Sequence, residues 1–370
     1  MRKLIVLLAI LVGGVSCDTS PNLVNCDFDE KAMLTNYADE LILPRLANFS
    51  LSLVLFESSV SEFSNNPTTG LLNEVKIFYG TAYLQYQECS AFQFGPGLID
   101  GVSFAERFNT FPTNVAAIND DISSGLAVAD AAKSAVGFPA LDYILFGEPG
   151  TTTEDVLELF TTAPNAANRM AYLQGIAGEL KTVSAQMEQG WLTSGGNYRE
   201  TFVNNTGTAD GSSISLLTNS FTFDFETLKN FKFKIPLGKF NGGVVLPEKV
   251  EAYYAEGSAQ LAKAHLENLR LIFEGTGTNG ANGPGFYEYL VCLETEAMNG
   301  GLLADDIRGQ FELIEQKLEL VSDPMSEALV SDFTTVDDAY REMQVMVPKI
   351  KHEMTSALAV QINYQDNDGD

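Results

Sequence analysis

The stretch KAMLTNYADELILPRLANFSLSLVLFESSVSEF, residues 31–63, decides the fold class of this chain. Its apolar side chains, such as Leu34, Tyr37 and Leu41, recur every three or four residues, which is the period of one helix face. Pro44 lacks an N–H group and is expected to kink this helix or divide it. The stretch therefore predicts a long amphipathic helix that buries one side against its neighbours.

The same helical period continues outward through most of the chain. Further helices are predicted at 70–92, 105–122 with a break at Pro112, 126–136, 153–160, 165–191, 248–273, 286–298, 301–322 and 334–360. Polar, glycine-rich loops are predicted at 193–213, 234–247 and 274–285. Only SFTFDF, residues 220–225, alternates with period two, which predicts a short strand or an extended connector. The prediction is an all-α fold of two packed helical-bundle domains, residues 18–205 and 206–370.

The composition excludes whole classes of protein. A chain that is 45% hydrophobic and 10% aromatic is not a disordered one. It has 22 Lys and Arg against 49 Asp and Glu, a formal net charge of −27. Such a surface repels phosphate backbones, so nucleic acid is excluded as a partner, and cations or basic proteins are favoured. The simplest role of this charge is to keep the protein soluble.

The first residues have the pattern of a secretory signal. Two basic residues precede an apolar run, residues 4–12, that is too short to remain as a membrane span. LVGGVSC, residues 11–17, is similar to a bacterial lipobox, in which cleavage leaves Cys17 as a lipid-modified N-terminus, although Gly14 stands where leucine is usual. Residues 1–17 are therefore predicted to be a lipoprotein signal peptide, with ordinary secretion as the alternative. We expect a lipid anchor on Cys17 to hold the protein at a membrane surface, in the periplasm or at the cell surface of a Gram-negative bacterium.

Besides Cys17, three cysteines remain: Cys26, Cys89 and Cys292. An odd count in an oxidising compartment is consistent with one disulfide and one buried thiol, and the sequence does not choose the pair. No two cysteines have C-x-x-C spacing, which excludes a zinc knuckle and a thioredoxin-like redox motif.

Histidine is nearly absent, and this restricts the chemistry most. His265 and His352 both lie in predicted helices, and no H-E-x-x-H motif is present, so a zincin-type protease is excluded. No G-x-S-x-G motif is present either, and neither histidine lies in the sequence context of a catalytic triad. The simplest interpretation of each lone histidine is a packed or surface residue.

Carboxylates are the remaining candidates for a site. Glu88 lies near the C-terminal end of a predicted aromatic helix, and Asp142 lies in GFPALDYILFGEPG, residues 137–150. Pro139 fits the first turn of a helix that begins after a break at Gly137. The helix dipole favours an acid in that first turn, so Asp142 can be a charge-complemented helix start as well as a ligand.

Several segments, in their order along the chain, resemble the imelysin-like proteins. These segments are NYADELILPRLANF (36–49), QECSAFQFGPG (87–97), GFPALDYILFG (137–147), RMAYLQGIAGEL (169–180) with Trp191, and KVEAYYAEGSAQLAKAHLENLRLIFEG (249–275). GFPALD stands where the family signature reads GxHxxE. The resemblance covers almost the whole mature chain, and it rests on the joint order of the elements.

The resemblance implies an all-helical periplasmic or surface protein of two bundle-like domains, in a family linked to iron uptake and originally classed as metallopeptidases. It also implies a metal site at the His and Glu of GxHxxE, with Glu88 nearby. Here Pro139 replaces the histidine and has no donor atom, while Asp142 keeps a carboxylate with one methylene less. Glu88 and Asp142 could still offer oxygens to a weakly held hard cation such as calcium or ferric iron. A catalytic metal-bound water needs three protein ligands and is disfavoured.

Three functions compete. The first is a non-catalytic, membrane-anchored binding component of iron or metal uptake, with possible partners among envelope uptake proteins; it requires Glu88, Asp142 and Glu251 to face one cavity. The second is a metallopeptidase, which the loss of the motif histidine disfavours. The third is a non-catalytic scaffold or peptide-binding lipoprotein, with an apolar pocket lined by Phe92, Phe94 and Tyr143. The predicted binding cleft comprises Glu88, Phe94, Gly95, Pro96, Gly137, Pro139, Asp142, Tyr143 and Glu251.

Overall fold

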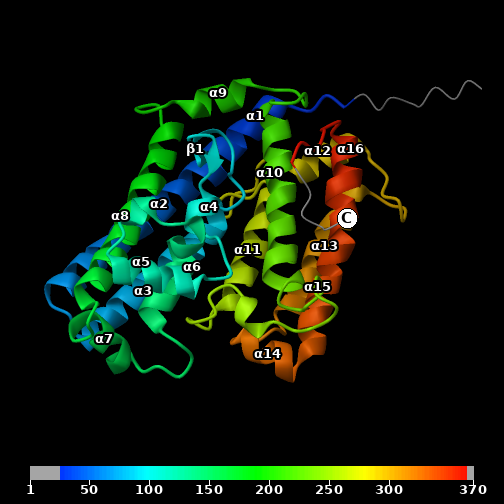
Figure 1. The fold of residues 1–370 in the computed structure, drawn as a ribbon. Helices are drawn as coiled ribbons and strands as arrows, with labels where there is room; N and C mark the ends of the chain where they lie inside the picture. Colours follow the sequence, from blue (N-terminus) through cyan, green and yellow to red (C-terminus); the bar gives the residue numbers. More distant parts are fainter. Residues whose placement is uncertain (1–25, 365–370) are drawn as a thin grey trace, which may run out of the picture.

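The computed structural model describes residues 26–364 of the chain. The predicted signal peptide and Cys17 lie outside the described residues, so both stay predictions. Within the described range the fold is all-α, with a single two-stranded hairpin formed by β1 (Leu98–Ile99) and β2 (Val102–Ser103) (Figure 1). The predicted fold class is confirmed.

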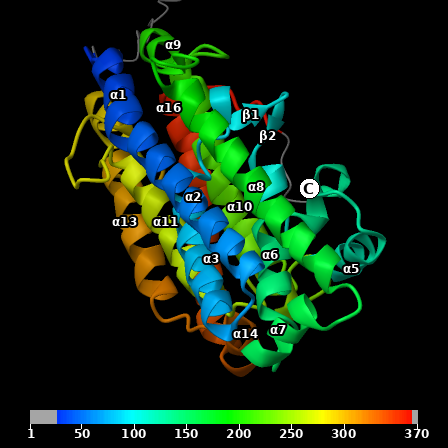
Figure 2. The same cartoon turned by 90° about the vertical axis from the view of Figure 1, so that its left-hand side faces the viewer.

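The N-terminal half is a bundle of three long helices, α2 (Leu43–Asn65), α3 (Thr69–Cys89) and α8 (Ala166–Trp191). In both views α2 lies between α3 and α8 and packs along each of them (Figures 1 and 2). Shorter helices cover the bundle: α4 (Ala105–Phe108), α5 (Val115–Ser124), α6 (Gly137–Phe146), α7 (Thr153–Thr161) and α9 (Tyr198–Asn204).

The C-terminal half is built around α10 (Ser213–Thr227), α11 (Ser258–Phe273), α13 (Leu303–Leu318) and α15 (Phe333–Pro348). A π-helical turn, Leu228–Lys234, extends α10, and a second one, Lys349–Met354, follows α15. The short helices α12 (Phe286–Cys292), α14 (Met325–Ser331) and α16 (Thr355–Ala357) complete this half. The two halves meet where α3 packs against α11.

The first predicted helix is confirmed, and Pro44 has a specific consequence for it. The helix α1 (Glu30–Asn36) continues through a π-helical turn, Tyr37–Ile42, into α2 without a break. The N–H of Leu43 bonds to the carbonyl of Ala38, five residues back, so the helix widens just before the proline. This 36-residue run is long and apolar enough to cross a membrane, and half of its most apolar window is buried within the protein. Because it packs against α3 and α8, it acts as a core helix of the bundle.

The predicted division at residues 205 and 206 falls between α9 and α10 and stays a prediction. The first described residues of the N-terminal half also contact the C-terminal half. Tyr37 donates a hydrogen bond to the Ile272 carbonyl at 2.7 Å, and Asn36 donates to the Gly275 carbonyl at 2.8 Å. The described residues before α2 therefore hold the C-terminal bundle directly.

Four details of the secondary-structure prediction are wrong. SFTFDF lies inside α10, not in a strand. Residues 126–136 form two 3₁₀ turns in place of a helix, and the Arg107 guanidinium donates hydrogen bonds to the Val128 and Ala131 carbonyls of this segment. The predicted helix 248–273 begins only at Ser258. The predicted loop 193–213 contains α9.

A disulfide joins Cys26 to Cys292, and Cys89 is a buried free thiol. The two bonded cysteines are 266 residues apart in sequence. The bond therefore closes a loop over most of the described chain, and it fixes the first described residue to the end of α12.

We expect Cys292→Ala to lower the free energy of unfolding by about 2–4 kcal/mol, because an open chain has more unfolded conformations. Urea denaturation followed by circular dichroism measures the change. Reductant should produce the same loss in the unmodified protein and none in the variant. Equal denaturation midpoints for the two proteins would contradict this expectation.

Candidate functional site

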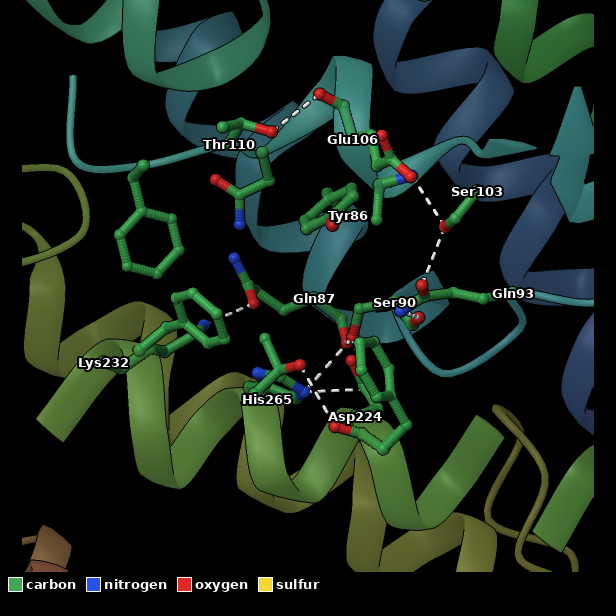
Figure 3. Close-up of a pocket in the computed structure, with 16 residues that line it drawn as sticks. Tyr86, Gln87, Ser90, Gln93, Ser103, Glu106, Thr110, Asp224, Lys232 and His265 are labelled. Atoms are coloured by element: carbon green, nitrogen blue, oxygen red, sulfur yellow. Dashed lines mark hydrogen bonds and ion pairs between the residues drawn. The ribbon is translucent and has the colours of Figure 1, made fainter. Parts of the chain in front are cut away.

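A cavity of about 220 Å³ lies between the two halves, where the end of α3 and the segment after it face α10 and α11 (Figure 3). Most of the exposed area of its wall is apolar, although most of its lining residues have polar side chains. The lining residues are Tyr86, Gln87, Ser90, Gln93, Ser103, Ala105, Glu106, Asn109, Thr110, Phe111, Phe223, Asp224, Thr227, Phe231, Lys232 and His265.

Ser90, Asp224 and His265 form a hydrogen-bonded group in this cavity (Figure 3). The Ser90 hydroxyl donates to Asp224 Oδ2 at 2.7 Å, and His265 Nε2 lies 2.7 Å from the same oxygen. Ser90 Oγ lies 3.3 Å from that same imidazole nitrogen. A catalytic triad needs the acid and the serine on opposite nitrogens of the imidazole, so this arrangement does not form one.

Two buried atoms of this group have no hydrogen-bond partner among the described residues: His265 Nδ1 and Asp224 Oδ1. Both side chains are almost fully buried, with exposed fractions of 1%. A buried polar atom without a hydrogen-bond partner costs free energy. These two atoms therefore favour a ligand that supplies the missing hydrogen bond or positive charge.

A buried ion pair lies beside this group. Lys232 Nζ is 2.7 Å from Glu251 Oε2, and it donates to Gln87 Oε1 at 2.7 Å. Asn109 donates to Glu251 Oε1 at 2.7 Å. Burial lowers the pKa of Lys232, and the Glu251 charge opposes that shift. The pair joins the π-helical turn after α10 to the segment that precedes α11.

Asp142 anchors the segment 250–257 to the N-terminal half. Its Oδ2 accepts the N–H of Tyr254 at 3.0 Å and its Oδ1 accepts the N–H of Ala255 at 2.8 Å. The Tyr79 hydroxyl also donates to Oδ1, at 3.4 Å. Because the carboxylate bonds backbone groups that a helix would use internally, residues 250–257 form turns, and the predicted helix starts later.

The segment 250–257 is also conformationally constrained. Ala252 and Glu256 have φ values of 49° and 59°, which side chains other than glycine adopt at a cost. Glu251 lies within it, so the anchor at Asp142 positions the carboxylate that pairs with Lys232. Asp142 is thus a positioning residue for the cavity.

The start of α6 explains why Asp142 lies where it does. The helix begins at Gly137, which places Asp142 in its second turn, so the helix-start interpretation of this acid is wrong. Gly137 has φ of 75°, and a Cβ there would lie 2.4 Å from the Phe108 carbonyl oxygen. Pro139 is buried in the first turn, and its carbonyl accepts the Thr113 hydroxyl. Glycine is therefore required at 137 for α6 to approach α4.

Burial raises the pKa of Asp142 to about 7, although the N–H groups of Tyr254 and Ala255 oppose the shift. The charge of Glu251 raises it slightly further. The carboxyl group therefore exchanges its proton near neutral pH in the folded protein, whereas in the unfolded chain it does so near 3.8.

The sign of the resulting pH dependence follows from linkage. Between these two pKa values the folded protein binds more protons at Asp142 than the unfolded chain, so this residue's contribution to stability is greatest at acid pH and is lost as pH rises through about 7. We expect the free energy of unfolding of the protein, compared with that of Asp142→Asn, to fall between pH 5 and 8. Parallel pH profiles for the two proteins would contradict this.

The structure separates the other predicted cleft residues from this anchor. Glu88 lines a second pocket with Arg45 and Glu267, and it accepts a hydrogen bond from Gln85 at 3.0 Å. Burial raises the pKa of Glu88. Glu88 therefore does not face the cavity of Glu251, and the structure does not bring the three predicted acids together.

The segment Phe94–Pro96 packs elsewhere as well. The Phe94 ring stacks on Phe202 and contacts the edge of Trp191, and a Cβ on Gly95 would meet the Tyr198 ring. Tyr143 lies on the side of the anchored segment, where its ring contacts Tyr254 and its hydroxyl bonds to Asn119. Phe92 is buried in the core. These aromatic side chains do not form the single pocket expected of them.

Among residues 26–364, no three His, Cys, Asp or Glu side chains converge on a point that could hold a metal ion. Both oxygens of Asp142 are already bonded to backbone N–H groups. The residues present therefore do not fit a resident catalytic zinc, which takes three protein ligands.

Comparison with known families shows to which family the chain belongs. The family model described as Imelysin, a peptidase family by name, matches residues 42–350, which is more than half of the chain. The chain belongs to the imelysin family. No curated protein matches it.

Two solved structures share this imelysin fold. One is an iron-regulated protein A precursor from Parabacteroides distasonis, with a TM-score of 0.73 at 16% identity, over 89% of this chain and 95% of that one. The other is an imelysin-like protein from Psychrobacter arcticum, with a TM-score of 0.69 at 17% identity, over 92% of this chain and 99% of that one. At these identities the similarity establishes the fold.

Sequence reasoning missed the polar group of this imelysin's cavity. Asp224 lies in the segment predicted as a strand, and His265 was interpreted as a packed or surface residue. One signal was available. The chain has only two histidines, and His265 lies in a helix that is predicted to pack, where a buried imidazole needs a polar partner. The partners Ser90 and Asp224 lie 175 and 41 residues away in sequence, and no local pattern links them.

Proposed function

We propose that this imelysin is a non-catalytic binding component of iron or metal uptake, whose cargo enters the cavity between the two halves. The observation that carries the proposal is the charge of that cavity. Asp224 lines the cavity, and Glu251 is buried beside the lining residue Lys232. Two buried carboxylates thus stand against the one ammonium of Lys232, so the site attracts a cation. The net charge of −27 extends the same preference to the whole surface.

The link to iron rests on one relative. The Parabacteroides protein with the same fold is described as iron-regulated protein A. An acidic cavity suits a metal cation as cargo, so the two observations support the same role.

A binding role fits the chemistry better than a peptidase role. Asp142, at the acid position of the family signature, bonds backbone N–H groups, and Pro139 offers no ligand at the histidine position. His265 contacts Ser90 and Asp224 through one nitrogen, so it cannot relay a proton between them. Incubation with unfolded peptides, with and without a chelator, tests this point, and metal-dependent cleavage would overturn it.

We propose further that the protein is an envelope lipoprotein attached through Cys17, in the periplasm or at the cell surface of a Gram-negative bacterium. The lipobox-like LVGGVSC supports this, and a lipid anchor would keep the cargo site beside the envelope uptake proteins that are its expected partners. Growth with radiolabelled palmitate should label the protein and leave Cys17→Ala unlabelled. An unlabelled parent protein would indicate ordinary secretion.

A peptide-binding scaffold is the second candidate, and the aromatic part of the cavity favours it. Phe111, Phe223 and Phe231 line the cavity and could hold an apolar side chain. In that case peptides would bind and metal cargo would not.

Calorimetric titration of the purified protein with ferrous, ferric, zinc and calcium ions, alone and with small chelators, tests the main proposal. We expect heat with at least one form of a metal and its loss in Asp224→Asn. The absence of heat with every metal form, together with binding of apolar peptides, would replace metal uptake with the scaffold role.

A further inference from the structure

Among the described residues, no lysine or arginine forms an ion pair with the Asp224 carboxylate of this cavity. The Lys232 ammonium is bonded to Glu251 and Gln87, whereas the Asp224 carboxylate has only the Ser90 hydroxyl and the His265 imidazole on one of its oxygens. Its other oxygen has no partner among the described residues. A carboxylate that is 1% exposed and incompletely bonded favours a ligand that carries positive charge.

Three phenylalanine rings also line the cavity. Phe111 and Phe231 contact each other edge to face, with ring centroids 6.3 Å apart, and Phe223 lines the same cavity. Aromatic faces attract cations and pack against flat apolar groups. The cavity of about 220 Å³ is smaller than the pockets of about 300–1,000 Å³ that hold drug-sized ligands, so it suits only a small organic molecule.

The imidazole suggests that the charge belongs to a metal. His265 directs Nε2 toward Asp224, and its Nδ1 has no partner. A histidine that donates its other ring N–H to a carboxylate is the usual form of a metal-binding histidine. One imidazole and one carboxylate are too few to complete the coordination of a transition metal, so the remaining ligands have to come from elsewhere.

We propose that the cavity takes its metal as a small, positively charged chelate, with the organic chelator against the three phenylalanine rings and the charge toward Asp224 and His265. This inference rests on the proposed role in metal uptake and specifies the form of the cargo. Anionic chelates are excluded from the site by Asp224 and Glu251. The bare ion is disfavoured because the protein supplies too few ligands.

Isothermal titration of the purified protein with four probes tests this inference: Ni²⁺ alone, the cationic 1:1 complex of Ni²⁺ with 2,2′-bipyridine, the anionic complex of Ni²⁺ with nitrilotriacetate, and bipyridine alone. We expect the cationic complex to bind at least tenfold more tightly than each other probe. Asp224→Asn should weaken that binding at least tenfold, and His265→Ala should abolish the change in the visible absorption of nickel that imidazole coordination produces.

Two further variants keep the test decisive. Asp338→Asn makes the same change of charge on α15, at a residue that pairs with Lys317 and does not line the cavity, and should leave binding unchanged. Phe231→Leu, which keeps the charges and removes one ring, should weaken the cationic complex severalfold even if Asp224→Asn fails to fold.

The possible failures are distinguishable. Equal or tighter binding of the bare ion, of the anionic chelate or of metal-free bipyridine would overturn the cationic-chelate inference and leave metal uptake intact. No binding of any nickel form would also overturn the inference, and metal uptake would then depend on the titrations with iron, zinc and calcium ions. If the cationic complex bound Asp224→Asn, His265→Ala and Phe231→Leu as tightly as the unmodified protein, the inference would also be overturned. The complex would then lie outside this cavity.

Discussion

Replacing Asp142 with alanine should lower the free energy of unfolding by about 3–5 kcal/mol. The change removes the acceptor of two backbone hydrogen bonds, from Tyr254 at 3.0 Å and Ala255 at 2.8 Å, and leaves a gap where a fully buried side chain was. Each buried donor that loses its acceptor costs about 1–3 kcal/mol. The strained segment 250–257 would lose its attachment to α6, and urea denaturation would record the loss.

Two comparisons isolate the anchor. Asp142→Asn keeps one acceptor oxygen and should lose about half as much as Asp142→Ala. Asp323 also accepts two backbone N–H groups, from Ala259 and Gln260 at the start of α11, but in a more exposed place. Asp323→Ala should therefore cost only about 1 kcal/mol, as a helix cap does. A similar cost for Asp142→Ala would show that Asp142 is no more than an ordinary cap.

The second large effect concerns the buried ion pair. Lys232→Met should destabilise the protein by about 3–5 kcal/mol, because it leaves Glu251 as a buried carboxylate without its cation. Thermal and urea denaturation measure this loss. Metal binding in the cavity should survive wherever the variant remains folded, because the substitution makes the site more negative.

A double substitution separates the pair from the packing around it. Lys232→Met combined with Glu251→Gln removes both charges and should recover most of the lost stability. The exposed pair Lys263 and Glu319 is the matched control, and Lys263→Met should change stability by less than about 1 kcal/mol. A double variant as unstable as Lys232→Met alone would show that the charges were not the cause.

The all-α fold was predictable because most of its helices bury one face only. In α2 the buried positions recur with the helical period, and that period is readable in residues 31–63. Helix α10 was missed because it is buried on nearly all sides. Its polar residues therefore do not mark one exposed face with the helical period. Its large apolar residues do keep helical spacing, at Ile214, Leu217, Phe221, Phe225 and Leu228.

The site was predictable only in part. The resemblance to the family drew attention to Asp142 and Glu88, and the first functional hypothesis added Glu251. Of these, Asp142 anchors the segment that contains Glu251. The role of Asp142 as a backbone anchor could not be predicted from the sequence, because its hydrogen-bond donors lie 112 and 113 residues away. Glu88 follows Gln87 on α3, yet one step along a helix turns a side chain by about 100°, and this separates the pocket of Glu88 from the cavity of Gln87.

The covalent bond between Cys26 and Cys292 orders the events of biosynthesis. A ribosome makes the first cysteine early, but its partner emerges only after a further 266 residues. During that interval the N-terminal thiol has to stay reduced or exchange with other thiols, and the long first helix has no C-terminal bundle to rest on. The bond that fixes Cys26 therefore forms late, and a pairing of cysteines in the order of their synthesis would join Cys26 to Cys89 and would have to be undone first.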